Sequence, residues 1–232
     1  MSNLSDAPEN TGVVDFYFDF SSTNSYFAAF LLPEICTRNH ARVNWVPLHL
    51  ASLFRGTGFD VMAMTAGKAR YLWRDHQRYA ELTGLPFRRP RRFPIKTSAA
   101  LRSVLAVATL AGEKAVRPDA GGPAEATIGP PSSALAAFTQ EMFRAYWEFD
   151  ENISQLEVIG AVAHRVGLDG PAVLKLSEAA ATRDQLAAIT DQAIARGVFG
   201  APTFFVGNEM FWGKDRLDFV ERWLMRRGSS SG

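Results

Sequence analysis

The spacing of hydrophobic residues along this chain changes twice, from strand-like to helix-like and back again. Near the N-terminus, short apolar runs at residues 13–20 and 42–48 are typical of buried strands. The apolar segment between them, residues 26–32, has the spacing of a helix. A strand, a helix and a strand in this order predict a βαβ unit, in which the two strands pair in parallel.

The middle of the chain, from about residue 63 to residue 194, has the apolar spacing of helices. Ser154 and Thr182 each stand three residues before Glu or Gln, the pattern of a capping box, and Pro171 suits the first turn of a helix. Residues 112–133 are rich in glycine and proline and predict a mobile surface loop. Helices are predicted at residues 66–83, 97–110 and 134–149, and from residues 154, 170 and 182 onward.

The C-terminal region returns to strand spacing. Residues 203–206 and 209–212 flank a Gly-Asn pair and predict a hairpin, which an amphipathic helix follows at 214–226. This order of elements predicts an α/β protein with a thioredoxin-like fold and an inserted all-helical domain. The expected boundaries are 12–61 and 195–227 for the discontinuous thioredoxin-like domain, 62–194 for the helical domain, and 1–11 and 228–232 for disordered tails.

The turn after the first predicted strand holds the first candidate for chemistry. Thioredoxin-like proteins place a Cys-x-x-Cys pair there, whereas this chain has Ser22 and Ser25 at the same spacing. Disulfide exchange needs two thiolates, which these serines cannot supply. A helix N-terminus favours an anion, so the turn could stabilise the thiolate of another molecule. Alternatively, Ser22 is simply the N-cap of the helix.

Two features near the C-terminus are candidates for the same cleft. Pro202 stands immediately before a strand, where a cis bond to Ala201 would leave backbone groups free to bind an extended peptide. The alternative is a proline that enters the strand without any ligand. Asp215, at the start of the last helix, is either a first-turn acid or a partner for a ligand's ammonium group.

Composition excludes several classes of protein. The net charge of +1 gives no indication of binding to nucleic acid or to an anionic membrane. Cys36 is the single cysteine, which fits a reducing compartment, and no secretory signal or spanning apolar run is present. We therefore expect a cytoplasmic protein. The basic run at residues 88–92 is interpreted as a solvated loop or as a source of attraction for carboxylate substrates, with nucleic acid as the less common alternative.

Two other classes of enzyme, zinc enzymes and serine hydrolases, are not indicated by the sequence. The four histidines lack metal-ligand spacing, and with one cysteine a zinc site is not expected. No Gly-x-Ser-x-Gly motif occurs, which argues against a serine hydrolase.

Five motifs resemble the 2-hydroxychromene-2-carboxylate isomerase family, a relative of kappa-class glutathione transferases in the DsbA-like superfamily. They occur in the family's order, and the resemblance spans about residues 13 to 225. The motifs are residues 18–26 (FDFSSTNSY), 84–87 (GLPF), 143–147 (FRAYW), 196–204 (RGVFGAPTF) and 211–216 (FWGKDR).

The resemblance implies a glutathione-dependent, commonly dimeric isomerase of aromatic compound catabolism, acting on an aromatic or polyketide-like carboxylate. In this family the glutathione thiolate is thought to add to the substrate's conjugated system and leave again after a bond has rotated. The implied site residues are Ser22 on the glutathione sulfur, Asn24 in the same turn, Ala201 and cis Pro202 on the cysteinyl backbone, Lys214 and Asp215 on the γ-glutamyl end, and Lys68 near a ligand carboxylate.

The sequence departs from the family pattern at Thr23, where proline is usual, and at Phe59 and Lys96, where asparagine is usual. The loop at residues 112–133 is also longer than expected. Two alternatives to the isomerase therefore stay open: a kappa-like glutathione transferase, and a non-catalytic thioredoxin-like protein that binds peptides.

Overall fold

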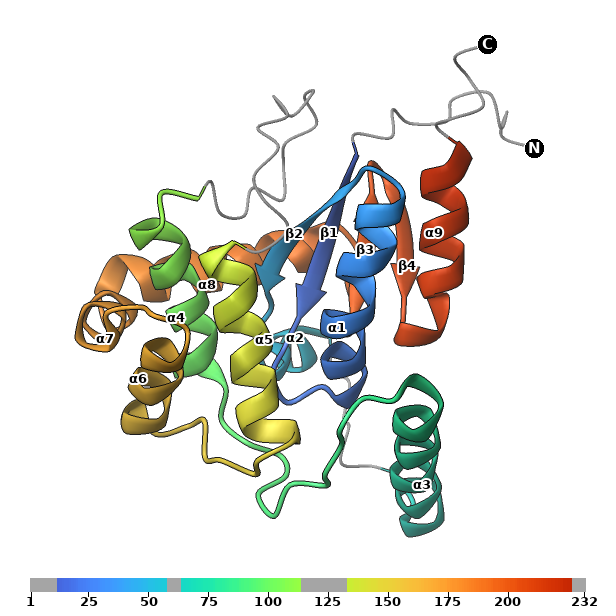
Figure 1. Cartoon of the computed structure of the whole chain (residues 1–232), viewed down its shortest axis with the longest axis horizontal. Coiled ribbons are helices and arrows are strands. Elements are labelled where there is room, and N and C mark those ends of the chain that lie inside the picture. The colour runs from blue at the N-terminus through green and yellow to red at the C-terminus, as the bar shows by residue number, and fades with distance from the viewer. Residues whose placement is uncertain (1–11, 58–63, 114–132, 227–232) are drawn as a thin grey trace.

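A four-stranded mixed sheet forms the centre of the computed structural model, which describes residues 12–57, 64–113 and 133–226 (Figure 1). Its strands, in the order β2-β1-β3-β4, are β2 (Arg42–Pro47), β1 (Val13–Phe18), β3 (Thr203–Val206) and β4 (Glu209–Trp212). β1 pairs in parallel with β2 and antiparallel with β3. The predicted βαβ unit and C-terminal hairpin are confirmed, and with them the α/β thioredoxin-like fold.

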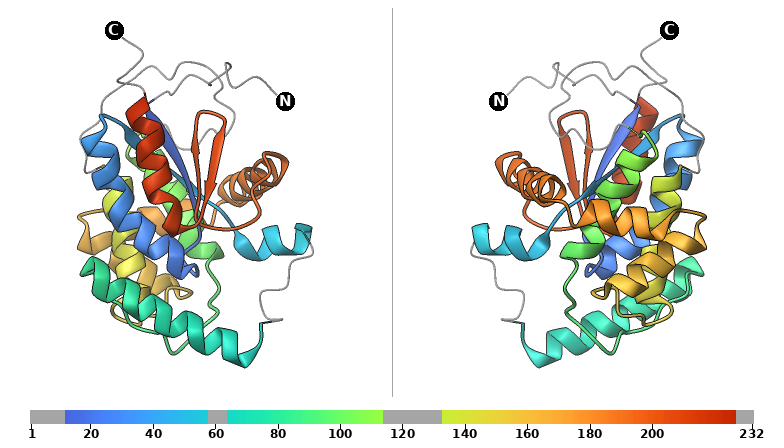
Figure 2. Two further views of the ribbon diagram at one scale, coloured as in Figure 1. Left: turned by 90° about the vertical axis from the view of Figure 1, so that its right-hand side faces the viewer. Right: turned by 90° about the vertical axis from the view of Figure 1, so that its left-hand side faces the viewer.

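Helices cover both faces of the sheet. α1 (Thr23–Arg38) and α9 (Leu217–Met225) lie on one face, and α8 (Ala180–Ala195) lies on the other with the short α2 (Leu50–Thr57) (Figure 2). β1 is buried on both sides, as expected for a central strand whose residues are mostly apolar. On one side its Phe16 ring stacks on Phe204 of β3, with ring centroids 5.4 Å apart.

The helical segment between β2 and β3 shares its hydrophobic core with the sheet. The ring of Phe143 packs against that of Phe20 at 4.8 Å, and Trp147 Nε1 donates a hydrogen bond to the Phe20 carbonyl at 2.9 Å. Besides α2 and α8, this segment contains α3 (Ala66–Thr83), α4 (Ser98–Leu110), α5 (Ala134–Trp147), α6 (Leu156–Arg165) and α7 (Gly170–Ser177).

Both predicted capping boxes are wrong. α6 begins only after Gln155, and Ser154 lies in the preceding turn, where its Oγ donates to the side chain of Asn152 at 2.7 Å. α8 begins at Ala180, and Thr182 Oγ1 donates to the carbonyl of Leu176 at the end of α7. Neither predicted residue therefore occupies an N-cap position, which belongs to Gln155 in α6 and to Ala179 in α8, and neither of these makes a side-chain cap hydrogen bond.

Two further differences from the sequence-based prediction concern a helix that was not predicted and the start of the last helix. The sequence pattern did not indicate α2, which has only eight residues. The closing helix starts as a 3₁₀ turn, η2 (Lys214–Arg216), before α9 begins. Phe59 and most of the loop predicted at 112–133 lie outside the described residues. No helix in the described part of the chain has the length and apolar character that crossing a membrane requires.

Candidate active site

The turn between β1 and α1 places Ser22 at the N-terminus of the helix. Ser22 has an extended backbone conformation, and its Oγ accepts a hydrogen bond from the Ser25 amide at 3.1 Å. Ser22 is therefore the N-cap of α1, as one interpretation of the sequence expected. The same Oγ donates its hydrogen to the carbonyl oxygen of Ala201 at 2.9 Å. The hydroxyl thus caps the helix and also joins two segments that are distant in sequence.

The Ala201–Pro202 peptide bond is cis. Pro202 precedes β3, whose first residue, Thr203, pairs with Tyr17 of β1. The Pro202 carbonyl accepts a hydrogen bond from the Gly213 amide at 2.9 Å, and Thr203 Oγ1 donates to the Gly200 carbonyl at 2.7 Å. These bonds hold the backbone on both sides of Ala201, so its carbonyl stays directed at Ser22.

A buried carboxylate that the sequence analysis did not single out supports this turn. Asp19 is 1% exposed, and its Oδ1 accepts hydrogen bonds from the amide and the hydroxyl of Ser21, both at 2.8 Å. Its Oδ2 accepts from the Leu50 amide at 3.0 Å and from Thr97 Oγ1 at 3.1 Å. Four donors satisfy the carboxylate, so Asp19 fixes the turn to the starts of α2 and α4. The available signal was an acidic residue near the end of the largely apolar run 13–20, which also contains Asp15.

Asn24 lies in the first turn of α1 and is half-buried. Its Oδ1 is buried without a hydrogen-bond partner in the described part of the chain. A buried amide oxygen without a partner is uncommon, because leaving it unpaired costs about 1–3 kcal/mol. Asn24 therefore offers an unused acceptor close to Ser22.

Lys214 lies beside α1, although its residue number is far from that helix. Gly213, whose φ is 99°, leads the chain from β4 into η2, which contacts α1. The Lys214 ammonium lies 4.1 Å from the centroid of the Tyr79 ring, and Tyr79 packs edge-on against Phe27 of α1 at 4.9 Å. Burial lowers the pKa of Lys214, while the negative charges of nearby carboxylates act in the opposite direction.

The other two residues predicted for the glutathione site, Asp215 and Lys68, are both exposed. Asp215 is exposed and forms an ion pair with the adjacent Arg216 at 2.8 Å. Lys68, in the first turn of α3, is exposed, and its ammonium group makes no hydrogen bond or ion pair with a described residue. The structure therefore brings Ser22, Ala201 and Pro202 together and places Lys214 beside α1. It shows no contact between Lys68 and this group.

His76 on α3 is a second residue that sequence reasoning did not assign. Its ring packs among aromatic side chains, with Trp73 at 5.9 Å and Phe87 at 6.2 Å between centroids. Burial, together with the positive charge of Lys214, lowers the pKa of His76 to about 4. Its Nδ1 is buried and has no partner among the described residues. His76 is therefore a neutral imidazole at pH 7.

Two exposed aromatic residues flank the approach to Ala201. The rings of Phe199 and Trp212 lie 5.1 Å apart, and each residue is about half exposed. Gly200, between Phe199 and Ala201, has no room for a side chain, since a Cβ there would stand 2.7 Å from Trp212 Nε1. The backbone of the Ala201 loop therefore passes directly against the Trp212 indole.

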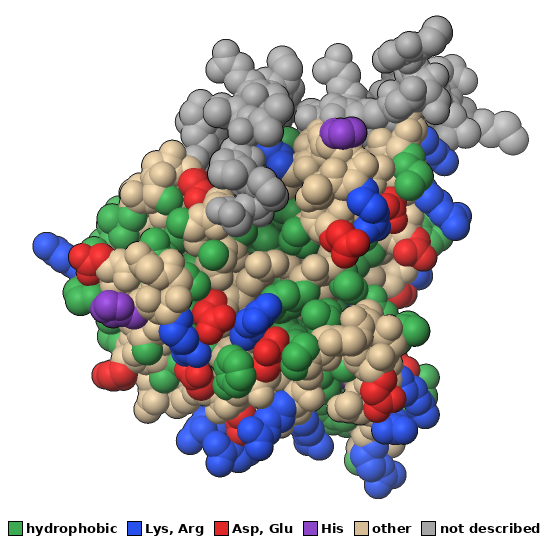
Figure 3. Space-filling view, viewed as in Figure 1, with side chains coloured by type: hydrophobic (Ala, Val, Ile, Leu, Met, Phe, Trp, Pro, Cys, Tyr) green, Lys and Arg blue, Asp and Glu red, His purple; other side chains and the backbone are tan. Residues whose placement is uncertain are grey.

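The basic run between α3 and α4 is partly used inside the molecule. Lys and Arg side chains gather along the lower edge of the face in Figure 3, where this segment runs in Figure 1. The guanidinium of Arg89 lies 4.7 Å from the Trp73 ring centroid, and Arg91 forms an ion pair with the buried carboxylate of Asp150. Two of the four arginines in this run therefore also have partners within the molecule.

Comparison with known proteins agrees with this architecture. The family model of the DSBA-like thioredoxin domain matches residues 13–119 and 131–224. A 2-hydroxychromene-2-carboxylate isomerase of Pseudomonas putida is 30% identical over 213 residues, which are 90% of this chain and 92% of that protein. The enzyme of the same name from Sphingobium xenophagum is 26% identical over 93% of this chain and 99% of its own length.

Solved structures of other proteins share this fold. A selenomethionine 2-hydroxychromene-2-carboxylate isomerase has a TM-score of 0.71 and 27% identity, covering 93% of this chain and 96% of that one. The cytosolic disulfide reductase DsbM from Pseudomonas aeruginosa with GSH has a TM-score of 0.60 at 18% identity over 94% and 98% of the two chains, a likeness of fold alone. The chain belongs to the DSBA-like thioredoxin domain family, and within it to the family of the 2-hydroxychromene-2-carboxylate isomerases.

Proposed function

We propose that this protein is a glutathione-dependent isomerase of the 2-hydroxychromene-2-carboxylate type, acting on an aromatic or polyketide-like carboxylate. One observation carries the proposal. The hydroxyl of Ser22, at the N-terminus of α1, lies 2.9 Å from the carbonyl of Ala201, which precedes a cis proline. A hydrogen-bond donor at a positive helix end, beside a peptide edge, suits a ligand that carries both a thiolate and an extended backbone.

The residues around Ser22 fit glutathione. Ser22 has one hydrogen, now given to Ala201 O, and it would redirect that hydrogen to the sulfur. The carbonyl of Ala201 would then accept an N–H of the bound tripeptide. The unpaired Oδ1 of Asn24 is a further acceptor in the same turn. Lys214 and Asp215 would hold the two charges of the γ-glutamyl end, and Lys68 would approach a ligand carboxylate.

The energetics of Ser22 are sufficient for this role. A thiol with an ordinary pKa of about 8.5 favours its protonated form by roughly 2 kcal/mol at pH 7. A hydrogen bond to a charged group contributes about 1.5–3 kcal/mol. The helix N-terminus adds about 0.3–1 kcal/mol. Their sum of about 2–4 kcal/mol is enough to make thiolate a major form at neutral pH.

When bound, glutathione would supply a thiolate that adds reversibly to the conjugated system of the substrate and leaves again after bond rotation, without net redox change. Ser22 would hold the sulfur without forming a disulfide, because serine has no thiol. Phe199 and Trp212 would offer flat apolar surfaces to an aromatic substrate near Ala201. The basic side chains near α3 would attract its carboxylate.

The test is consumption of 2-hydroxychromene-2-carboxylate by the purified protein, with and without reduced glutathione. We expect turnover only with glutathione, and a loss of at least about tenfold in Ser22→Ala. Ser133→Ala is the matched control, because Ser133 caps α5 in the same way but lies at the start of a different helix. A control that loses as much activity as Ser22→Ala would contradict the assigned role.

Two other results would replace the proposal. Conjugation of glutathione to an electrophilic aryl halide, without isomerisation, would make the protein a kappa-like transferase. A calorimetric titration without heat of binding at millimolar glutathione would favour a non-catalytic peptide binder. The proposal also includes a cytoplasmic homodimer, and light scattering of the purified protein at micromolar concentration would show twice the chain mass.

A further inference from the structure

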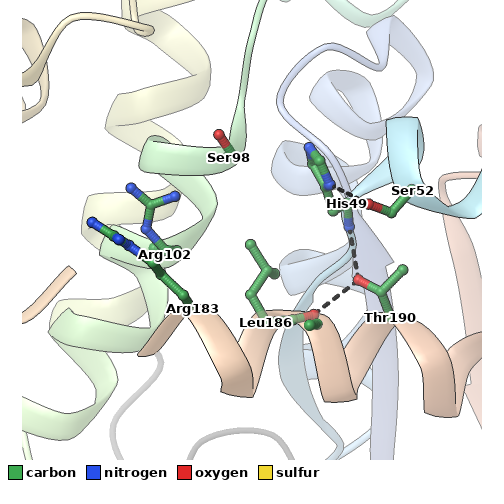
Figure 4. A pocket seen from close by; sticks show the side chains of 8 residues that line it. His49, Ser52, Ser98, Arg102, Arg183, Leu186 and Thr190 are labelled. Carbon is green, nitrogen blue, oxygen red and sulfur yellow. Dashed lines mark hydrogen bonds between the residues drawn. The ribbon is translucent and has the colours of Figure 1, made fainter. Parts of the chain in front are cut away.

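A pocket of about 220 Å³ lies among α2, α4 and α8 (Figure 4). Arg102 and Arg183 form one wall, and His49 and Ser52 form the opposite one. Ser98, the first residue of α4, and Leu186 of α8 also line the pocket. Ser22 is not among the lining residues, and none of them is acidic.

The arginine wall carries more positive charge than its partners neutralise. Arg102 and Arg183 come from different helices and form ion pairs with the same carboxylate, that of Glu178. Glu178 itself does not line the pocket. Nε of Arg102 donates to the Ser177 carbonyl at 2.7 Å, and its Nη1 has no hydrogen-bond partner in the described part of the chain. Two guanidinium groups and one carboxylate leave one unit of positive charge on this wall.

The opposite wall presents a neutral donor. Ser52 Oγ accepts a hydrogen bond from the guanidinium of Arg55 at 2.8 Å, so it can use its own hydrogen toward Nδ1 of His49, also at 2.8 Å. Nδ1 is then the acceptor nitrogen, and the ring hydrogen belongs to Nε2. Burial lowers the pKa of His49, which keeps the ring neutral at pH 7. In Figure 4 the second ring nitrogen lies on the side of the ring away from Ser52.

The start of α4 adds further donors. Its N-cap, Thr97, gives its hydroxyl hydrogen to Asp19 and makes no side-chain hydrogen bond to its own helix. The first turn of α4 therefore has no side-chain cap, and Ser98 brings that turn to the edge of the pocket. The lining combines cationic and neutral donors with the apolar side chain of Leu186.

We infer that this pocket binds a small organic anion, a carboxylate or a phosphate monoester, at a site separate from Ser22. Arg102 and Arg183 hold the negative group, the donors of His49 and Ser98 face it, and Leu186 packs against the carbon skeleton. The volume accommodates a molecule of several heavy atoms rather than a single ion.

The position of the pocket connects it to the Ser22 turn. Leu50 and Thr97, which donate to the buried Asp19, are the chain neighbours of the lining residues His49 and Ser98. Asp19 in turn accepts both hydrogen bonds from Ser21, the residue before Ser22. An occupant of the pocket therefore contacts the segments that hold the turn without touching Ser22 itself.

The test is a titration of the full-length protein followed by the ¹H–¹⁵N signals of its imidazole rings. Succinate is the carboxylate probe and glycerol 3-phosphate the phosphate probe, with sodium chloride at matched ionic strength as the blank. The signal of His49 is assigned by its loss in His49→Gln. We expect the His49 signal to shift saturably with one of the two probes, which identifies the ligand as a carboxylate or as a phosphate monoester. The signal of the exposed His164 should stay unchanged.

Variants locate the site. Arg183→Gln should weaken binding at least fivefold, and because its side chain is 55% exposed it should fold normally. Arg102→Gln is less suitable, since it also removes the bond to Ser177. Arg222→Gln, an exposed arginine on α9, is the matched control and should bind as the wild type does. Absence of a saturable His49 shift with both probes, or equal binding by Arg183→Gln and wild type, would overturn the inference.

Discussion

Ser22 Oγ donates a hydrogen bond to Ala201 O at 2.9 Å across a separation of 179 residues. The same oxygen caps α1 through the Ser25 amide. The hydroxyl group is therefore shared between a local and a long-range role, and its substitution should affect both stability and chemistry.

The first prediction concerns Ser22→Ala. Loss of the N-cap and of the bond to Ala201 should reduce the free energy of unfolding by about 1–2 kcal/mol. Without the donor, the pKa of the bound glutathione thiol should rise, so much of the lost turnover should return at alkaline pH. Thiolate absorbance of bound glutathione, titrated against pH, measures this. An identical titration curve in Ser22→Ala and Ser133→Ala would refute the role of the hydroxyl.

Asp19→Asn should be more damaging to stability, although the two side chains have nearly the same shape. The side chain of Asn has one oxygen and one NH2 group. In either orientation the NH2 group would face donors, those of Ser21 or those of Leu50 and Thr97, and leave them unsatisfied. We expect a loss of about 2–4 kcal/mol in urea unfolding. The control is Asp169→Asn, because Asp169 is the N-cap of α7 and Asn caps equally well. Equal unfolding midpoints for the two variants would argue against the supporting role of Asp19.

His76 should make stability fall as the pH is lowered. Its pKa is about 4 in the folded protein and about 6.5 when unfolded, so between these values the unfolded state binds more protons. Its contribution is complete above pH 6.5, is lost progressively toward pH 4, and amounts to about 3 kcal/mol. Comparison of unfolding free energies at pH 7 and pH 4.5 should show a smaller decrease in His76→Gln than in the wild type. A decrease of the same size in both proteins would contradict the prediction.

Cys36 should be inert in the native protein. It is 2% exposed, and burial raises the pKa of its thiol to about 12. Ellman's reagent should therefore react with one thiol per chain only after unfolding. The protein should also fail to reduce insulin, because the turn at Ser22 contains no cysteine. Insulin reduction faster than that of a Cys36→Ala control would be incompatible with this expectation.

The sequence predicted those parts of the site that depend on neighbouring residues. Ser22 as an N-cap and Pro202 at a strand entry follow from residue type and from the pattern within a few positions. The two long-range contacts of Asp19 could not be predicted, since Leu50 and Thr97 lie 31 and 78 residues away and their donors are recognisable only in the folded chain. For the same reason α2 was missed: its first amide is held by Asp19, and eight residues give too little periodicity.

The capping boxes illustrate the opposite error. The patterns at Ser154 and Thr182 match the motif locally, yet α6 begins after Gln155 and α8 begins after Ala179. Thr182 reaches the end of α7, which no pattern within its own helix could indicate. The surrounding fold, rather than the local motif, therefore determines where these two helices begin.

The bond between Ser22 and Ala201 also has a consequence for biosynthesis. A chain made in the N-to-C direction produces the turn at Ser22 first, then Leu50 and Thr97, and Ala201 only 179 residues after Ser22. Contacts between residues so far apart form slowly because a long loop must close first. A nascent chain therefore carries the serine without the carbonyl that completes the site until these 179 residues have been made. Ligand recognition at this turn becomes possible only after the helical segment between β2 and β3 has been made.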